Sequence, residues 1–176
     1  TRRGLIDLID PRFADRIIGV IDLLDGRAVH AIAGARDRYR PVAFCDGDAT
    51  ELAEHYLAIG VKRLYVADLS ALTGGTIQTE ALQHLATLGF DQFLFDTGWT
   101  GRESASDRKL LAELAPQLSN VDWIAATESC RSSDSVATLA SAVGANRTFL
   151  GLDFRNGEFL SQDVSLKAWL DVANDL

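Results

Sequence analysis

The stretch GVIDLLDGRAVHAIAG, residues 19–34, decides how the chain is expected to fold. It continues an apolar run, Ile17–Leu24, that has the composition of a buried strand but contains one acid, Asp22. Asp25-Gly26 follows directly, and this dipeptide favours a two-residue hairpin turn. The segment RAVHAIA is therefore expected to return as a short antiparallel strand. A carboxylate near the end of a core strand calls for an explanation.

Strand and helix patterns alternate along the rest of the chain. The predicted strands are Ile17–Leu24, Arg63–Leu69, Gln92–Phe95, Val121–Ala126 and Thr148–Leu152. The predicted helices are Glu51–Ile59, Glu80–Leu88, Asp107–Leu118, Asp134–Val143 and a last one that begins near Ser165. Asp134 is expected as an N-cap, and Gly89 and Gly144 as terminators. This alternation predicts an α/β fold with a parallel sheet covered by helices.

Composition narrows the class of protein and its partners. With 176 residues, of which 47% are apolar, we expect a single domain over residues 1–176. The formal net charge of −8 disfavours a nucleic-acid partner, because like charges repel. No apolar run reaches the roughly 18 residues of a membrane span. Two cysteines, Cys45 and Cys130, are too few for a disulfide framework, so we expect a cytoplasmic protein.

An acid stands at the end of each predicted strand. The five are Asp22, Asp68, Asp96, Glu128 and Asp153. Taken singly, such a residue usually caps a helix or starts a loop. In parallel βα architectures, however, the C-terminal strand ends face one side, where ligands bind. Five acids in register therefore predict an acidic rim in which at least one pKa is raised.

Three motifs resemble a known family. VIDLLDGRAVHAIAG, LYVADLSAL and FLGLDFRNG look like the first, second and fifth strands of the histidine-biosynthesis barrels, which include ProFAR isomerase and the cyclase subunit of imidazole glycerol phosphate synthase. The resemblance covers nearly all of residues 17–160. It implies a TIM (β/α)8 barrel of the ribulose-phosphate-binding type. It also implies that Asp22 and Asp153 are the acid–base pair of an Amadori-type aldose–ketose rearrangement of an aminosugar phosphate.

The chemistry suits such a pair. Opening an aminoaldose ring needs a proton on the ring oxygen, and the shift to a ketose needs a proton taken from C2. Two carboxylates with separated pKa values can do both without a metal or cofactor. Asp22 and Asp153 lie 131 residues apart, which fits equivalent positions in two half-barrels. The implied substrate contacts are Asp68, Asp96, Thr97, Gly98, Thr127 and Glu128.

The sequence departs from the family at its phosphate clamp, a Gly-Gly-Gly-Ile-Arg turn after strand three. Here DTGWTGR puts Asp96 and Thr97 in place of glycines and keeps only Gly98, while AATES brings Glu128 into the turn after strand four. Acids repel phosphate, so either the site holds something else or the family activity has been lost. A divergent branch, associated with one-carbon organisms that use tetrahydromethanopterin, resembles VHAIAG and RDRYRP more closely.

Other functions remain open at this point. The acidic rim is a candidate divalent-cation site, and a non-catalytic barrel could serve as a synthase-like assembly partner or homo-oligomer. Only five βα units are legible, whereas a closed barrel takes about 250 residues. We therefore expect the remaining units from residues beyond Leu176 or from a swapped partner chain, unless the sheet is open. The alternative is a complete five-stranded open sheet of flavodoxin type. Trp99 is expected to stack on a ring or cap the barrel mouth, and Cys130 is not expected to be a nucleophile.

Overall fold

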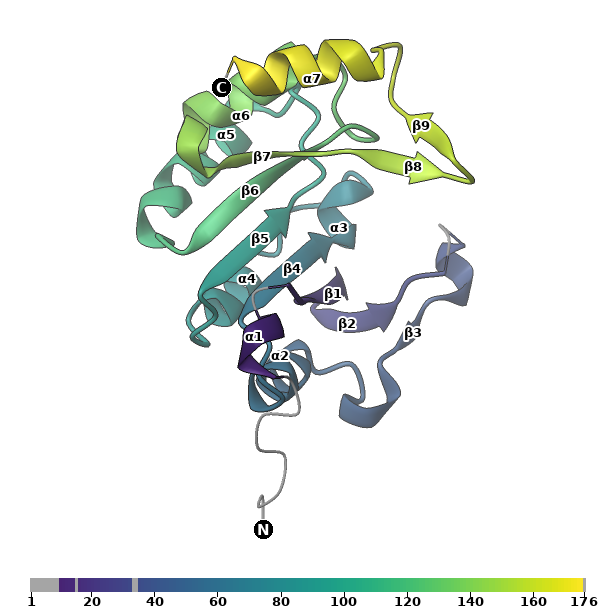
Figure 1. Cartoon of the computed structure of the whole chain (residues 1–176), viewed down its shortest axis with the longest axis vertical. Helices are drawn as coiled ribbons and strands as arrows, with labels where there is room; N and C mark the ends of the chain where they lie inside the picture. The colour runs from purple at the N-terminus through teal and green to yellow at the C-terminus, as the bar shows by residue number, and fades with distance from the viewer. Residues whose placement is uncertain (1–9, 15, 33–34, 176) are drawn as a thin grey trace. The chain divides into compact units, whose positions relative to one another are not determined.

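The computed structural model describes residues 10–14, 16–32 and 35–175 (Figure 1). The chain divides into two compact units, Thr1–Leu94 and Phe95–Leu176, which are described in turn as unit 1 and unit 2.

Unit 1 combines parallel and antiparallel strand pairs with helices. Its elements are α1 (Pro11–Ala14), β1 (Ile18–Leu24), β2 (Arg27–His30), β3 (Arg40–Pro41), α2 (Ala49–Ala58), β4 (Arg63–Asp68), α3 (Leu69–Leu72) and α4 (Thr79–Ala86), with 3-10 turns at Arg36–Arg38 and Ala43–Cys45. β1 pairs in parallel with β4 and antiparallel with β2, and β2 pairs antiparallel with β3. The predicted return strand and the predicted parallel pairing are both confirmed.

The two faces of β1 differ in burial. Gly19, Ile21 and Leu23 are buried, while the residues between them are more exposed. A Cβ at Gly19 would lie 2.9 Å from the ring of Tyr56, so the buried face packs closely on α2. That helix begins where it does because the Asp48 carboxylate accepts hydrogen bonds from its first amides. Alternation of this kind is what a strand with one covered face requires.

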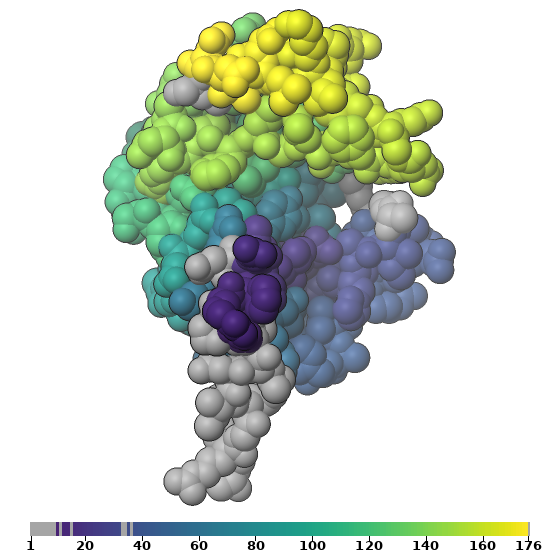
Figure 2. Space-filling view, viewed as in Figure 1, coloured from purple at the N-terminus to yellow at the C-terminus, as the bar shows by residue number. Residues whose placement is uncertain are grey.

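Unit 2 repeats the strand–helix alternation. β5 (Gln92–Asp96) leads into it, and the elements that follow are α5 (Ala105–Leu114), β6 (Val121–Ala126), α6 (Asp134–Val143), β7 (Thr148–Gly151), β8 (Asp153–Arg155), β9 (Glu158–Leu160) and α7 (Leu166–Asn174), with 3-10 turns at Ala115–Gln117 and Ala145–Arg147. β6 and β7 pair in parallel, and β8 and β9 form an antiparallel hairpin. This hairpin lies at the surface of unit 2, where Phe154 is 55% exposed (Figure 2).

Aromatic packing and one arginine stabilise unit 2. Trp123 on β6 packs against Phe95 with ring centroids 5.3 Å apart. Arg147 donates hydrogen bonds to the carbonyl oxygens of Ala115 at 2.6 Å, Val121 at 2.9 Å and Leu118. These contacts tie the 3-10 turn after α5 to the start of β6. Burial lowers the pKa of Arg147, but an arginine stays charged after such a shift.

The helix boundaries correct two predictions. α5 ends at Leu114 and not at Leu118, because Pro116 has no backbone N–H and a 3-10 turn follows instead. Asp134 is the first residue of α6, and Ser133 is its N-cap. In the part of the chain that is described, no helix is both long and apolar enough to cross a bilayer.

Candidate functional site

Asp22 lies on the less-covered face of β1, near the turn into β2. It pairs with Val29 across the hairpin, and the turn residues Asp25 and Gly26 have φ of 48° and 78°. Such positive φ values define the two-residue turn that Asp-Gly favours. Burial raises the pKa of Asp22 above its ordinary value, while the Ala31 backbone N–H and His30 oppose the rise. Asp22 therefore gains a proton more readily than a fully solvated aspartate.

Asp153 has an equivalent place in unit 2. It pairs with Leu160 across the β8–β9 hairpin, whose turn residues Asn156 and Gly157 have φ of 54° and 83°. Each of these residues lies 131 positions after its counterpart in the β1–β2 hairpin. Sequence reasoning missed this second hairpin, although Asn-Gly is a strong signal for one. Each unit thus carries an aspartate at the equivalent position of a two-residue β-hairpin, three residues before the turn.

Thr127 and Glu128 hold the Asp153 carboxylate. The Thr127 hydroxyl accepts a hydrogen bond from the Asp153 backbone N–H at 3.0 Å and donates to its Oδ2 at 3.3 Å. The Glu128 backbone N–H donates to the same Oδ2 at 3.1 Å. Partial burial raises the pKa of Glu128, with Asp153 adding to the rise and Arg155 opposing it. Glu128 is exposed overall, so water moderates these effects.

Two carboxylates accept hydrogen bonds from the backbone of the loop after β5. Asp96 is 4% exposed and accepts a hydrogen bond from the Gly98 N–H at 2.8 Å. The Thr100 N–H donates to Glu103 Oε1 at 2.5 Å. Two backbone donors that could face an anion, the N–H groups of Gly98 and Thr100, are therefore already bonded to acids. Asp96 and Thr97 are both buried.

Trp99 anchors this loop. Its side chain is 1% exposed, and its Nε1–H donates to the Ser135 carbonyl at 2.9 Å. The interpretation that Trp99 stacks on a ligand ring is therefore wrong, because the indole is buried in the core of unit 2. Its glycine neighbours marked a loop but could not show that the ring turns inward.

Asp68 does not share the face of Asp22. In the parallel register, Asp22 aligns with Ala67 and Asp68 aligns with Leu23, so the two carboxylates leave the sheet on opposite sides. Asp68 is fully buried and accepts hydrogen bonds from the backbone N–H groups of Ala71 and Gln78. The expected common rim thus does not extend to Asp68.

Cys130 is inert as a nucleophile. It is buried, and its thiol points to the Trp99 carbonyl at 3.2 Å. Burial raises the pKa of Cys130 to about 12, with nearby Asp96, Glu103 and Asp153 adding to the rise. A thiol in this setting is not ionised at neutral pH.

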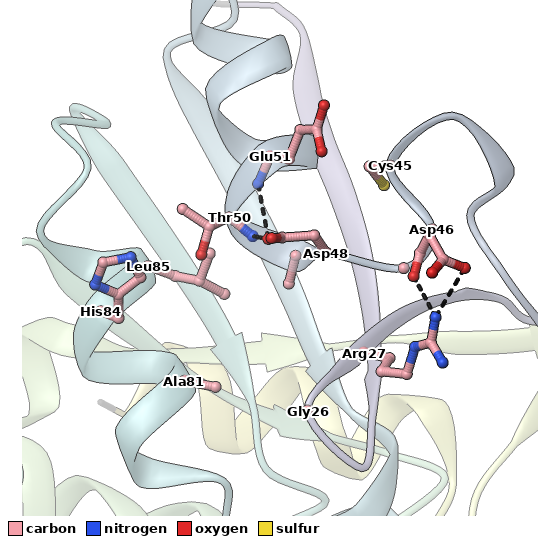
Figure 3. A pocket seen from close by; sticks show the side chains of 12 residues that line it. Gly26, Arg27, Cys45, Asp46, Asp48, Thr50, Glu51, Ala81, His84 and Leu85 are labelled. Carbon is pink, nitrogen blue, oxygen red and sulfur yellow. Dashed lines mark hydrogen bonds and ion pairs between the residues drawn. The ribbon is translucent and has the colours of Figure 1, made fainter.

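A pocket of about 470 Å³ lies at the start of α2 in unit 1 (Figure 3). Arg27 in its wall donates to the Asp46 carboxylate at 3.0 Å and to the Asp46 carbonyl, while Asp48 caps α2. None of the predicted site residues lines this pocket. Among the residues that the structure describes, no group of three or more His, Cys, Asp or Glu is placed to hold a metal ion.

Parallel βα units with acids after their strands are typical of α/β barrels and of doubly wound α/β sheets, so the family decides between the two classes. Residues 16–174 match the histidine biosynthesis protein family, and the chain belongs to this family. The expected family and its TIM-barrel fold are thus confirmed. The chain is also 29% identical over 152 residues to an uncharacterized protein of Methanocaldococcus jannaschii. This match covers 85% of the chain and 61% of the relative, so the chain spans less than two thirds of that protein's length.

Proposed function

We propose that the protein is an isomerase-type enzyme that carries out an Amadori-type aldose–ketose rearrangement of an aminosugar phosphate or a related small metabolite. Asp22 and Asp153 are its acid–base pair. The observation that carries the proposal is the matching register of the two hairpins, in which each aspartate lies three residues before a two-residue turn. Family membership supports the reaction class.

The reaction needs two proton transfers at one substrate. One carboxyl group delivers a proton to the ring oxygen as the ring opens, and the other takes a proton from C2 of the open-chain imine. Burial raises the pKa of Asp22 above its ordinary value, which favours Asp22 as the proton donor of the pair. Asp153 is oriented by the Thr127 hydroxyl and the Glu128 N–H, which both donate to its Oδ2. The two aspartates thus have different surroundings, since Asp22 is partly buried and Asp153 accepts hydrogen bonds from two donors, and this difference supports the proposed division of roles.

Isosteric amide variants test this proposal. Asp22→Asn and Asp153→Asn keep the side-chain shape but cannot exchange the proton, so each should slow the rearrangement of a phosphoribosyl aminoaldose by about 10²–10⁴-fold. The rate is followed as conversion of the aldose substrate into the ketose product, separated by chromatography. Asp175→Asn, at an exposed position after α7, is the matched control and should retain the parent rate. Full activity in either test variant contradicts the proposal.

The closed loop after β5 favours a second candidate. Since Asp96 and Glu103 occupy the Gly98 and Thr100 N–H groups, a divergent homologue with a different reaction in one-carbon or pterin metabolism is the alternative. Because the described acids form no ready metal cluster, a divalent cation would bind at the rim only after they move closer together. The other possibility is a homologue that acts without catalysis as an assembly partner.

Titrations with inorganic phosphate and with magnesium separate the two candidates. Phosphate should shift the amide resonances of Gly98 and Thr100 if the loop opens to hold a substrate phosphate. Unchanged resonances, together with magnesium binding in calorimetry, favour the alternative. Binding of neither leaves the assembly role, which predicts co-purification with a partner.

A further inference from the structure

We infer that Gln78 and Asp68 are positioning residues that fix the β1–β2 hairpin and, through it, the Asp22 carboxylate. Their catalytic meaning rests on the function proposed for Asp22, whereas their effect on the hairpin can be measured without any substrate.

Gln78 contacts the end of β1 and the hairpin turn. Its Nε2 donates to the Leu23 carbonyl at 3.2 Å, and its Oε1 accepts a hydrogen bond from the Gly26 N–H. Leu23 and Gly26 lie before and within the turn, more than 50 residues away in sequence. One side-chain amide therefore holds the end of β1 and the turn in a single geometry.

Asp68 in turn fixes Gln78. Its Oδ1 accepts from Gln78 Nε2 at 2.7 Å, and its Oδ2 accepts from the Gln78 backbone N–H at 2.8 Å. Asp68 is fully buried at the end of β4, and charge-assisted hydrogen bonds in such a place are strong and directional. The amide of Gln78 is thus restricted to the orientation in which it reaches the turn.

Ser70 provides a second, independent contact. Its hydroxyl accepts a hydrogen bond from the Asp25 N–H at 3.0 Å and donates to Asp25 Oδ1 at 3.1 Å. Both turn residues are therefore bonded to the segment that follows β4. Asp22 is the residue before Leu23 and pairs with Val29 across the same hairpin. Its side chain lies on the opposite face of the strand from that of Leu23. Because the backbone of Asp22 is part of the hairpin, any movement of the hairpin also moves its carboxylate.

Gln78→Leu tests the inference with two readouts, hydrogen exchange of the turn amides and the carbon-13 titration of the Asp22 carboxyl group. Loss of its partner should speed exchange of the Gly26 amide by about five- to tenfold, the size of one net hydrogen bond. The Asp22 titration midpoint should fall toward its ordinary value, because a released hairpin exposes the carboxylate to water. A residue that only stabilises the fold would lower the unfolding temperature without moving this midpoint.

Two further variants make the test decisive. Gln117→Leu removes a different amide hydrogen bond, to the Glu113 carbonyl in unit 2, and should leave both readouts unchanged. Ser70→Ala should speed exchange of the Asp25 amide and remains informative if Gln78→Leu does not fold. Parent-like exchange and titration in a folded Gln78→Leu protein would overturn the inference. A shifted titration with an unchanged turnover rate would instead uphold the positioning role and contradict the proposed function of Asp22.

Discussion

Replacing Gly101 by alanine should loosen the loop after β5, and Gly157→Ala is its control. Both glycines belong to unit 2 and have φ of 83°. A Cβ at Gly101 would lie 2.3 Å from Oγ and 2.7 Å from Cβ of Ser135, whereas nothing lies within 4 Å of a Cβ at Gly157. The two substitutions therefore share the same backbone strain and differ in packing alone.

The size of the difference follows from these contacts. Left-handed backbone costs about 1–2 kcal/mol at either position. Forcing Ser135 away adds about 1–3 kcal/mol of overpacking. It also breaks the bond from Ser135 Oγ to the Thr100 carbonyl, worth about 1 kcal/mol. Gly101→Ala should thus lose about 2–4 kcal/mol more free energy of unfolding than Gly157→Ala.

Urea unfolding followed by tryptophan fluorescence measures this difference. The three tryptophans, Trp99, Trp123 and Trp169, are all buried in unit 2, so the signal reports on that unit. Equal losses in the two variants would refute the argument, because they would show that the loop does not pack on Ser135.

Three other substitutions test separate features. Asp22→Asn should stabilise the protein at pH 7, because burial raises the Asp22 pKa and so penalises its charged form in the fold. The gain should disappear as the pH falls below 3.8, where the unfolded chain is protonated too, and a gain that persists there would contradict the assignment. Arg147→Met should lower the free energy of unfolding by about 2–4 kcal/mol by leaving three carbonyls without their charged donor, while Arg108→Met on exposed α5 should change it little. Thr127→Val should cost about 1–2 kcal/mol and speed hydrogen exchange of the Asp153 amide, whereas Thr127→Ser keeps the hydroxyl and should restore both; parent-like exchange in the valine variant would count against the contact.

Much of the fold could be predicted because the signals are local. The predicted strands and helices reappear with boundaries shifted by a few residues, since period-two and period-3.6 patterns follow the buried faces. The β1–β2 hairpin was predictable from Asp25-Gly26. A two-residue hairpin turn needs positive φ at both central residues, and Asp-Gly is one of the few pairs that adopt it easily. The β8–β9 hairpin was missed because its strands have only three residues each.

The surroundings of the acids could not be predicted. Asp68 and Asp22 both end apolar runs, and only the register of β1 on β4 shows that they leave the sheet on opposite sides. Gln78 carried no signal, because its partners at Leu23 and Gly26 are far away in sequence. Trp99 was misread for a similar reason, since its partner Ser135 is 36 residues away. Long-range hydrogen bonds of this kind depend on tertiary structure and leave no local pattern.

The number of residues between each aspartate and its turn determines which face of the strand carries the carboxylate. Asp22 and Asp153 both stand three residues before the first residue of a turn, and the backbone there admits few residue types. A one-residue insertion or deletion inside this interval would rotate the carboxylate to the opposite face of its strand. Asp68 lies on that face, where it is fully buried and its carboxylate accepts three hydrogen bonds. A displaced carboxylate without such partners would destabilise the fold. The residues between each aspartate and its turn can therefore vary during evolution, whereas we expect their number to stay the same.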